Sequence, residues 1–218
     1  QVAISALDDQ NDVAEVALVA QRFCEDKNIY AVICHGGSSQ SAAAAPIYEA
    51  AGMTNMAPSS SNYELTEQGY KYFVRHVIKD TRNSPQVIAQ LVNNLGCKNI
   101  GILYANNDYG VGNREAAEMA AEQLGIEINL KETFTPTTDK DFTAVLTKIQ
   151  TANLDGLGMY ADYTEGGMIV NQAAQLGLTD KLQIVGQNAL TYMRFVDLAG
   201  GYENLKNVYI QGAFNPYE

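Results

Sequence analysis

Histidine and cysteine, the side chains most often used for metal binding and nucleophilic catalysis, are scarce in this chain of 218 residues. The only histidines are His35 and His76, and the cysteines Cys24, Cys34 and Cys97 form no CxxC pair and no Cys/His ligand spacing. A histidine-based metal site or catalytic triad therefore has little to be built from, and we expect neither a metal nor a cofactor. Because the cysteines are odd in number, at least one thiol is unpaired, and we interpret them as buried structural thiols.

Positive charge is also in short supply. Lysine and arginine number 14 against 25 aspartates and glutamates, which gives a net charge of −11. Nucleic acids and anionic membranes both attract clustered positive charge, so neither is an expected partner. No apolar run approaches the roughly 20 residues that cross a bilayer, and no signal-peptide pattern stands at the amino end. Because the sequence begins at Gln1, inside an expected strand, we interpret it as a mature or trimmed chain.

What the sequence has instead is a regular alternation of short apolar runs and segments with helical spacing. Helical faces recur at i, i+3, i+4 and i+7 within residues 13–24, 87–95 and 142–149. The expected strands are residues 1–7, 29–34, 53–57, 71–77, 99–105, 126–134, 155–161, 181–186 and 207–213. This alternation predicts an α/β fold with parallel sheets flanked by helices. One detail conflicts with it, because Pro46 lies inside the expected helix 39–52, which should kink or begin late.

The alternation breaks at residues 63–84, which contain one expected strand, many polar residues and no helical face. We interpret this stretch as a crossing between two lobes. Residues 1–78 then form part of lobe 1, residues 79–214 form lobe 2, and residues 215–218 begin a return to lobe 1. The hinge is expected near residues 77–82 and again near 213–217.

Two hydroxyl-rich turns follow consecutive strands of lobe 1, HGGSSQS at 35–41 and PSSSN at 58–62. The carboxyl ends of parallel strands meet at one edge of a sheet, where open α/β sheets bind their ligands. Serine hydroxyls and the N–H groups at a helix start both suit a carboxylate. We therefore predict that ligand binding involves Ser38, Ser59, Ser60 and Ser61. The alternative is that they only cap helices and form turns, as serines do without any further function.

The strand ends of lobe 2 carry Tyr109, Asp162, Tyr163 and Asn188. A carboxylate suits an ammonium group and the tyrosine rings suit an apolar or aromatic side chain, so we include these four residues in the predicted site. The alternatives stay open at this point. Tyr109 and Tyr163 also fit half-exposed packing positions, and Asp162 also fits the cap of the helix that follows it.

A nucleotide-binding enzyme is a competing interpretation, because glycine turns in α/β sheets also hold phosphates. The best match is YGVGNRE at 109–115, which has two glycines at suitable spacing but Glu115 where a third small residue belongs. No P-loop, Gly-x-Ser-x-Gly elbow or metal-ligand spacing occurs in the sequence. We therefore predict a binding protein and not an enzyme.

In these motifs the sequence resembles the type I periplasmic binding proteins, in particular the branched-chain amino-acid (Leu/Ile/Val) binding family of ABC importers. The similarity runs nearly end to end through LDDQND (7–12), AVICHGGSSQS (31–41), GMTNMAPSSSNYELTEQGYKYFVR (52–75), ILYANNDYGVG (102–112) and TPTTDKDFTAVLTKIQTANLDGL (135–157). Each stretch alone is a weak match, and together they are specific. The resemblance implies a two-lobed fold from which this chain lacks the first strand and helix and the C-terminal return.

The resemblance also implies roles for individual residues. The family's amino-acid-binding serine corresponds to Ser38, its backbone donor after a proline to Ser59, and its second hydroxyl to Ser61. Its aromatic lid residue corresponds to Tyr109.

Three features depart from the family pattern. The second-lobe tyrosine is replaced by Asp162, next to Tyr163, and the glutamate that binds the ligand ammonium is replaced by Asn188. Either Asp162 takes over the ammonium, or the ligand is not a simple branched-chain amino acid. The family's disulfide positions hold Asn11 and Gly37, so the resemblance implies that this bridge is absent.

For function, the resemblance implies a solute-binding protein that captures an amino acid or related small carboxylate between two lobes. It would deliver this ligand to the membrane permease of an ABC importer. The implied location is periplasmic or extracellular, reached with a signal peptide and with or without a lipid anchor. The alternative is the ligand-binding ectodomain of a sensory receptor, which shares the fold.

Overall fold

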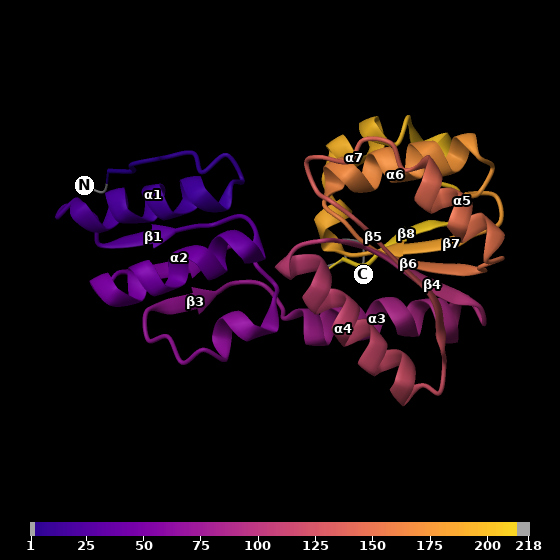
Figure 1. Ribbon diagram of the computed structural model, residues 1–218, viewed down its shortest axis with the longest axis horizontal. Coiled ribbons are helices and arrows are strands. Elements are labelled where there is room, and N and C mark those ends of the chain that lie inside the picture. The colour runs from indigo at the N-terminus through magenta and orange to yellow at the C-terminus, as the bar shows by residue number, and fades with distance from the viewer. Residues whose placement is uncertain (1–2, 213–218) are drawn as a thin grey trace. The chain divides into compact units, whose positions relative to one another are not determined.

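Two compact units make up the part of the chain that the computed structural model describes, residues 3–212, and they divide between Lys79 and Asp80. Each unit has its own parallel sheet and its own helices (Figure 1). This confirms the predicted α/β class, with parallel sheets flanked by helices. The expected return at 215–218 and the second hinge segment near 213–217 lie outside the described residues.

The first unit builds a small sheet from three short strands. Its elements are α1 (Val13–Glu25), β1 (Ala31–Ile33), α2 (Ser38–Ala51), β2 (Thr54–Ala57), the 3-10 turn η1 (Tyr63–Thr66) and β3 (Phe73–Arg75). The strands pair in the order β1-β2-β3, all parallel. Helix α1 begins at the cap Asp12, whose carboxylate accepts hydrogen bonds from the N–H groups of Ala14 (2.8 Å) and Glu15 (3.1 Å). Apolar side chains of α1 and α2 pack with Val32 of β1 to form the core.

One face of this three-stranded sheet is largely exposed. The register places Ile33, Met56 and Val74 side by side on the three strands, so their side chains share a face. Ile33 is 73% exposed and Val74 is 50% exposed. Val32, which points to the opposite face, is buried beneath α1 and α2. Within the described residues, the helices thus cover one side of the sheet.

The second unit is a five-stranded α/β sheet with helices on both faces (Figure 1). Its elements are α3 (Asp80–Ala89), the π-helical turn η2 (Gln90–Asn94), β4 (Ile100–Ala105), α4 (Asp108–Gln123), β5 (Ile128–Phe134), α5 (Thr143–Thr151), β6 (Gly156–Tyr160), α6 (Tyr163–Gln175), β7 (Gln183–Gly186), η3 (Asn188–Leu190), α7 (Met193–Leu198), η4 (Tyr202–Asn204) and β8 (Val208–Ile210). The strands are parallel in the order β5-β4-β6-β7-β8.

Two apolar cores lie on the two faces of the second sheet. Successive residues of β4 show the division, because Ile102 packs into the core with α3 and α4, and Leu103 packs into the core with α5 and α6. Both residues are almost completely buried. This two-sided burial explains why the adjacent strands β4 and β6 read as nearly continuous apolar runs, whereas β5 at the edge of the sheet alternates. No helix in the described part of the chain has the length and apolar composition needed to cross a membrane.

Two expectations from the sequence are wrong, and a third is narrowed. Residues 3–7 form no strand, although their spacing favours one, and Ile4 is 92% exposed. For the helix that contains Pro46, a kink or a late start was expected, and the late start is excluded, because α2 begins at Ser38 and continues through Pro46. Both Pro46 and Ala42, whose carbonyl loses its N–H partner to the proline, are exposed, so water can satisfy that carbonyl.

The second wrong expectation concerns residues 80–84, which were expected to lack a helix and instead form the first turns of α3. The buried face of α3 follows helical spacing from its start, but its first members are the polar residues Asp80, Asn83 and Ser84. Apolar residues, Val87 and Ile88, join this face only later. A search for apolar periodicity therefore recognises only the second half of the helix.

Candidate functional site

The two serine turns of the first unit are brought together at the carboxyl ends of β1 and β2. These strands are neighbours in the sheet, so the segments that follow them meet. The Ser60 hydroxyl lies 2.7 Å from that of Ser41 and donates to the carbonyl of Gly37 (2.9 Å). The Ser59 hydroxyl donates to the carbonyl of Gly36. Side-chain hydrogen bonds thus tie the second turn to the first.

The serines of these two turns differ in the hydrogen bonds that their hydroxyls form. Ser60 is buried and its hydroxyl is used inside the protein, and Ser59 is exposed. Ser38, at the first position of α2, accepts a hydrogen bond from the N–H group of Asn62 (3.2 Å). The hydroxyl of Ser61 is buried and has no hydrogen-bond partner among the described residues. A buried hydroxyl without a partner is uncommon in folded proteins and indicates a missing ligand or water.

The amino end of α2 supplies a second reason to expect an anion here. Gly37 occupies the N-cap position, and it has no side chain with which to bind the first N–H groups of the helix. The first turn of α2 also contains no acidic residue. The partial positive charge at this helix start is therefore not neutralised by a side chain of its own first turn.

Arg75 of β3, which sequence reasoning missed, holds the second serine turn in place. Its guanidinium donates to the carbonyls of Ser61 (3.1 Å) and Asn62 (2.6 Å) and to the hydroxyl of Thr66 (2.7 Å). The planar guanidinium makes all three bonds at once. An arginine at the end of a short strand gives no local signal of this role, because its acceptors lie 9–14 positions earlier in the chain.

We expect Arg75→Lys to destabilise the first unit by about 1–2 kcal/mol, because a lysine ammonium cannot reach two carbonyls and a hydroxyl in one geometry. Urea unfolding would measure this change. Arg22→Lys on the exposed side of α1 is the matched control and should change the free energy of unfolding by less than about 0.5 kcal/mol. Equal effects of the two substitutions would contradict the role of Arg75.

The histidine of the first turn is part of a separate hydrogen-bonded chain. His35 is buried, with Nδ1 2.6 Å from Oδ2 of Asp9 and Nε2 3.2 Å from the hydroxyl of Tyr48. The thiol of Cys34 also contacts that hydroxyl (3.4 Å), and burial raises its pKa to about 11. A thiol with so high a pKa stays protonated and unreactive near neutral pH. Burial likewise raises the pKa of the Cys97 thiol to about 11. All three cysteines are free thiols, with Cys97 buried and the other two half-buried.

In the second unit, the four predicted residues gather at one edge of the sheet. Tyr109 follows β4, Asp162 and Tyr163 follow β6, and Asn188 follows β7, and these three strands are adjacent. Asn107 caps α4 by accepting from the N–H group of Gly110 (2.9 Å), which fixes the start of the helix that carries Tyr109. The Tyr109 hydroxyl donates to Oε1 of Gln187 (3.2 Å), and burial, followed by the charge of Asp162, raises the pKa of this phenol well above its ordinary value.

Asp162 occupies the N-cap position of α6, but its carboxylate caps nothing. No hydrogen bond from the helix N–H groups to this side chain is formed, and the described residues give it no ion pair. Asp162 retains an exposed surface, yet the protein atoms around its carboxyl group, and then the charge of Glu165, raise its pKa to about 6. The carboxylate is thus placed where a cationic partner would stabilise it.

The remaining two predicted residues of this edge are half-buried. The Tyr163 ring packs against the ring of Tyr192 at 5.1 Å between centroids. Asn188 begins η3, and its carbonyl accepts from the N–H group (3.1 Å) and the hydroxyl (2.7 Å) of Thr191. These two bonds anchor the turn through the backbone carbonyl of Asn188.

Gly110 decides against the nucleotide-binding interpretation of YGVGNRE. A Cβ atom at this position would lie 1.9 Å from the carbonyl oxygen of Ala105, at the end of β4. The glycine is therefore required for the close approach of α4 to β4 within the protein itself. Its presence needs no phosphate to explain it.

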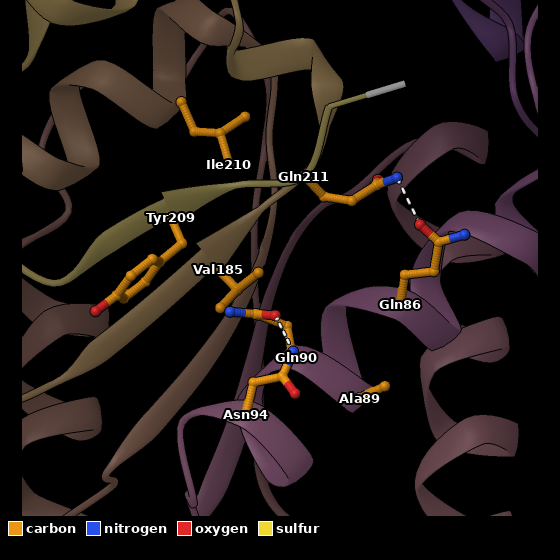
Figure 2. A pocket seen from close by; sticks show the side chains of 8 residues that line it. All are labelled: Gln86, Ala89, Gln90, Asn94, Val185, Tyr209, Ile210 and Gln211. Carbon is orange, nitrogen blue, oxygen red and sulfur yellow. Dashed lines mark hydrogen bonds between the residues drawn. The ribbon is translucent and has the colours of Figure 1, made fainter. Parts of the chain in front are cut away.

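The cavity of about 670 Å³ shown in Figure 2 lies elsewhere in the second unit. Side chains of α3, η2, β7, β8 and the residue after β8 line it: Gln86, Ala89, Gln90, Asn94, Val185, Tyr209, Ile210 and Gln211. A hydrogen bond of 2.8 Å joins the carboxamides of Gln211 and Gln86 across its rim. None of the eight candidate residues lines this cavity.

Comparisons with known proteins identify the family of the chain. The model of the periplasmic binding protein family matches residues 1–218, the whole chain. The chain belongs to this family. The resemblance recognised in the sequence motifs is thereby confirmed.

Among relatives of this periplasmic binding protein, the leucine-specific-binding protein of Salmonella typhimurium is 29% identical over 194 residues, which are 89% of this chain and 52% of that protein. The solved structure of the substrate-binding protein LivJ from Streptococcus pneumoniae in complex with isoleucine has a TM-score of 0.86 at 28% identity, covering 96% of this chain and 58% of LivJ. The leucine-binding protein LivK of Thermotoga maritima has a TM-score of 0.87 at 26% identity, covering 97% and 59%. The chain thus spans little more than half the length of these relatives.

Proposed function

We propose that this chain is the ligand-binding part of a solute-binding protein that captures an amino acid or a related small carboxylate for an ABC importer. The observation that carries the proposal is the buried hydroxyl of Ser61, which has no partner among the described residues and belongs to the turn that is bonded to the uncapped start of α2. A carboxylate accepts hydrogen bonds from such a hydroxyl and from helix N–H groups, and its charge is stabilised by the helix dipole. The relatives named for leucine binding and the structure with bound isoleucine support this ligand class.

Each unit contributes one half-site to the proposed recognition. In the first, Ser38, Ser59 and Ser61 bind the carboxylate, and Ser60 supports them by joining the two turns. In the second, Tyr109 and Tyr163 contact the ligand's apolar side chain, and Asp162, aided by Asn188, pairs with its ammonium group. We assign the half-sites to lobes at residues 1–78 and 79–214, with the hinge between them.

Delivery to a membrane permease and a location outside the cytoplasm, periplasmic or extracellular, belong to the same proposal. The name of the matched LivJ structure, a branched-chain amino acid transporter substrate-binding protein, supports delivery and favours transport over a sensory ectodomain. The name of the family, periplasmic binding protein, supports the location. These names also favour capture of the ligand over its chemical conversion.

Isothermal titration calorimetry on the full-length protein tests the ligand class. L-leucine, L-isoleucine and 4-methylpentanoate (leucine without its amino group) form the panel, with leucinol as the analogue that lacks the carboxylate. We expect binding of carboxylate-bearing compounds and at least tenfold weaker binding of leucinol, because only the carboxylate is recognised by α2 and Ser61. Failure of all four compounds to bind, or equal binding of leucinol and leucine, would overturn the proposal.

A further inference from the structure

Gln187, a residue that no sequence motif singled out, lies at the centre of a buried hydrogen-bonded network in the second unit. It follows β7 directly and is 1% exposed. Its Oε1 accepts from the Tyr109 hydroxyl (3.2 Å), and its Nε2 donates to Oδ1 of Asn113 (2.6 Å) and lies 3.2 Å from Oγ of Ser84. One carboxamide thereby joins the end of a strand to two helices, α3 and α4.

The network closes on itself through α4. Oδ1 of Asn113 also accepts from the Ser84 hydroxyl (2.7 Å), and Nδ2 of Asn113 donates to the carbonyl of Tyr109 (2.8 Å). Tyr109 is therefore held at two points, by its hydroxyl and by its backbone. Asn113 and Ser84 are both fully buried. Because an unpaired polar group at this depth is costly, each side chain of the network fixes the orientation of the others.

In the hydrogen bond between Tyr109 and Gln187, the phenol is the donor and the carboxamide oxygen is the acceptor. The pKa of Tyr109 is raised, so the hydroxyl keeps its proton at physiological pH and acts as the donor. Oε1 of Gln187 must then face Tyr109, which leaves Nε2 to face the acceptor Oδ1 of Asn113. The hydroxyl of Tyr109 is thus engaged inside the unit, and what the residue can offer a ligand is its ring.

We propose that Gln187 is a positioning residue for ligand binding, which holds the hydroxyl of Tyr109 so that the tyrosine presents its ring to the apolar side chain of the ligand. This inference rests on the proposed function and adds a determinant of its selectivity. It predicts that Tyr109 favours apolar ligand side chains, because its hydroxyl already donates its proton to Gln187.

A double-mutant cycle in the full-length protein tests the inference, with L-leucine as the probe. We expect Gln187→Met, which keeps the size but removes the carboxamide, to weaken L-leucine binding about tenfold. Tyr109→Phe releases the ring from the network and should have a smaller effect. In the double variant the loss should equal that of the stronger single change rather than the product of the two, because both remove the same bond.

Gln172→Met is the matched control for loss of a bonded carboxamide. Gln172 accepts from the N–H group of Phe142 (2.7 Å) and donates to the carbonyl of Lys140 (2.8 Å), and it contacts none of the candidate residues through these bonds. We expect this variant to lower the Tm of the protein while leaving the Kd for L-leucine within twofold of the wild type. Thermal unfolding without ligand should show the same non-additivity between Gln187→Met and Tyr109→Phe.

Three results would count against the inference. If Gln187→Met, like Gln172→Met, leaves the Kd for L-leucine within twofold of the wild type, the role of Gln187 is structural only. If the two losses multiply in the double variant, Gln187 does not act through Tyr109. If the wild-type protein binds no compound of the carboxylate panel, the proposed function itself fails, and the inference fails with it.

Discussion

Replacing Ser61 with alanine is expected to weaken the binding of a small carboxylate by about 1–3 kcal/mol, the cost of leaving a buried acceptor without its donor. The Ser61 hydroxyl is buried and lacks a partner among the described residues. Removing it therefore breaks no hydrogen bond in the ligand-free protein. Ser61→Ala should therefore leave the free energy of unfolding unchanged or slightly raised. The combination of weaker binding and undiminished stability distinguishes a ligand-binding hydroxyl from a structural one.

Ser38→Ala should weaken binding by a similar amount, but with a cost in stability. The Ser38 hydroxyl accepts a hydrogen bond from the N–H group of Asn62, which would be left unpaired. Calorimetry with the best-binding carboxylate measures both affinities, and Ser5→Ala, at an exposed position of the same unit, is the control. Wild-type affinity in both Ser61→Ala and Ser38→Ala would contradict the assignment of the carboxylate to this half-site.

Asp162→Asn is expected to weaken the binding of L-leucine by about 1.5–3 kcal/mol and to leave 4-methylpentanoate almost unaffected. An ammonium group removed from water needs a charged partner, and an amide offers only a dipole. The Asp162 carboxylate, after β6, is available to a ligand, because it neither caps α6 nor forms an ion pair with a described residue. Equal losses for the amino acid and the deaminated acid, or no loss for either, would remove Asp162 from the role of counter-ion.

The pH dependence gives an independent measure of the same carboxylate. Its pKa in the folded protein, about 6, lies above the ordinary aspartate value, so the folded state binds this proton more tightly than the unfolded state. The resulting contribution to stability is present at low pH and is lost as the pH rises through about 6. Asp162→Asn should therefore stabilise the ligand-free protein at pH 7.5 and not at pH 4, by at most about 1 kcal/mol, because solvent screens this exposed group.

Ligand binding should respond to pH in the opposite sense. Pairing with an ammonium requires the carboxylate, so the affinity of the wild type for L-leucine should fall as the pH drops from 7 to 5. The affinity of Asp162→Asn for L-leucine should stay flat over this window. Parallel pH profiles in the wild type and the variant would show that another group titrates.

The sequence by itself determined the class of the fold and the edge of each sheet where the candidate residues lie. Strand–helix alternation is a local property of composition and spacing, and in parallel sheets it dictates that turns such as 35–41 and 58–62 meet. The family could also be recognised from the sequence, because each of its motifs lies within a short, continuous stretch of the chain. The eight candidate residues accordingly lie at strand ends in both units.

Only the tertiary structure decided which of these side chains are already used inside the protein. Ser60 and Ser61 are neighbours of the same type, yet one hydroxyl bonds to Ser41 and Gly37 and the other has no partner among the described residues. The roles of Gln187 and Arg75 depend on partners in other elements of the fold, 74 and 13 positions away in the chain. A hydrogen bond depends on distance and direction in space, and periodicity along a sequence carries no information about either.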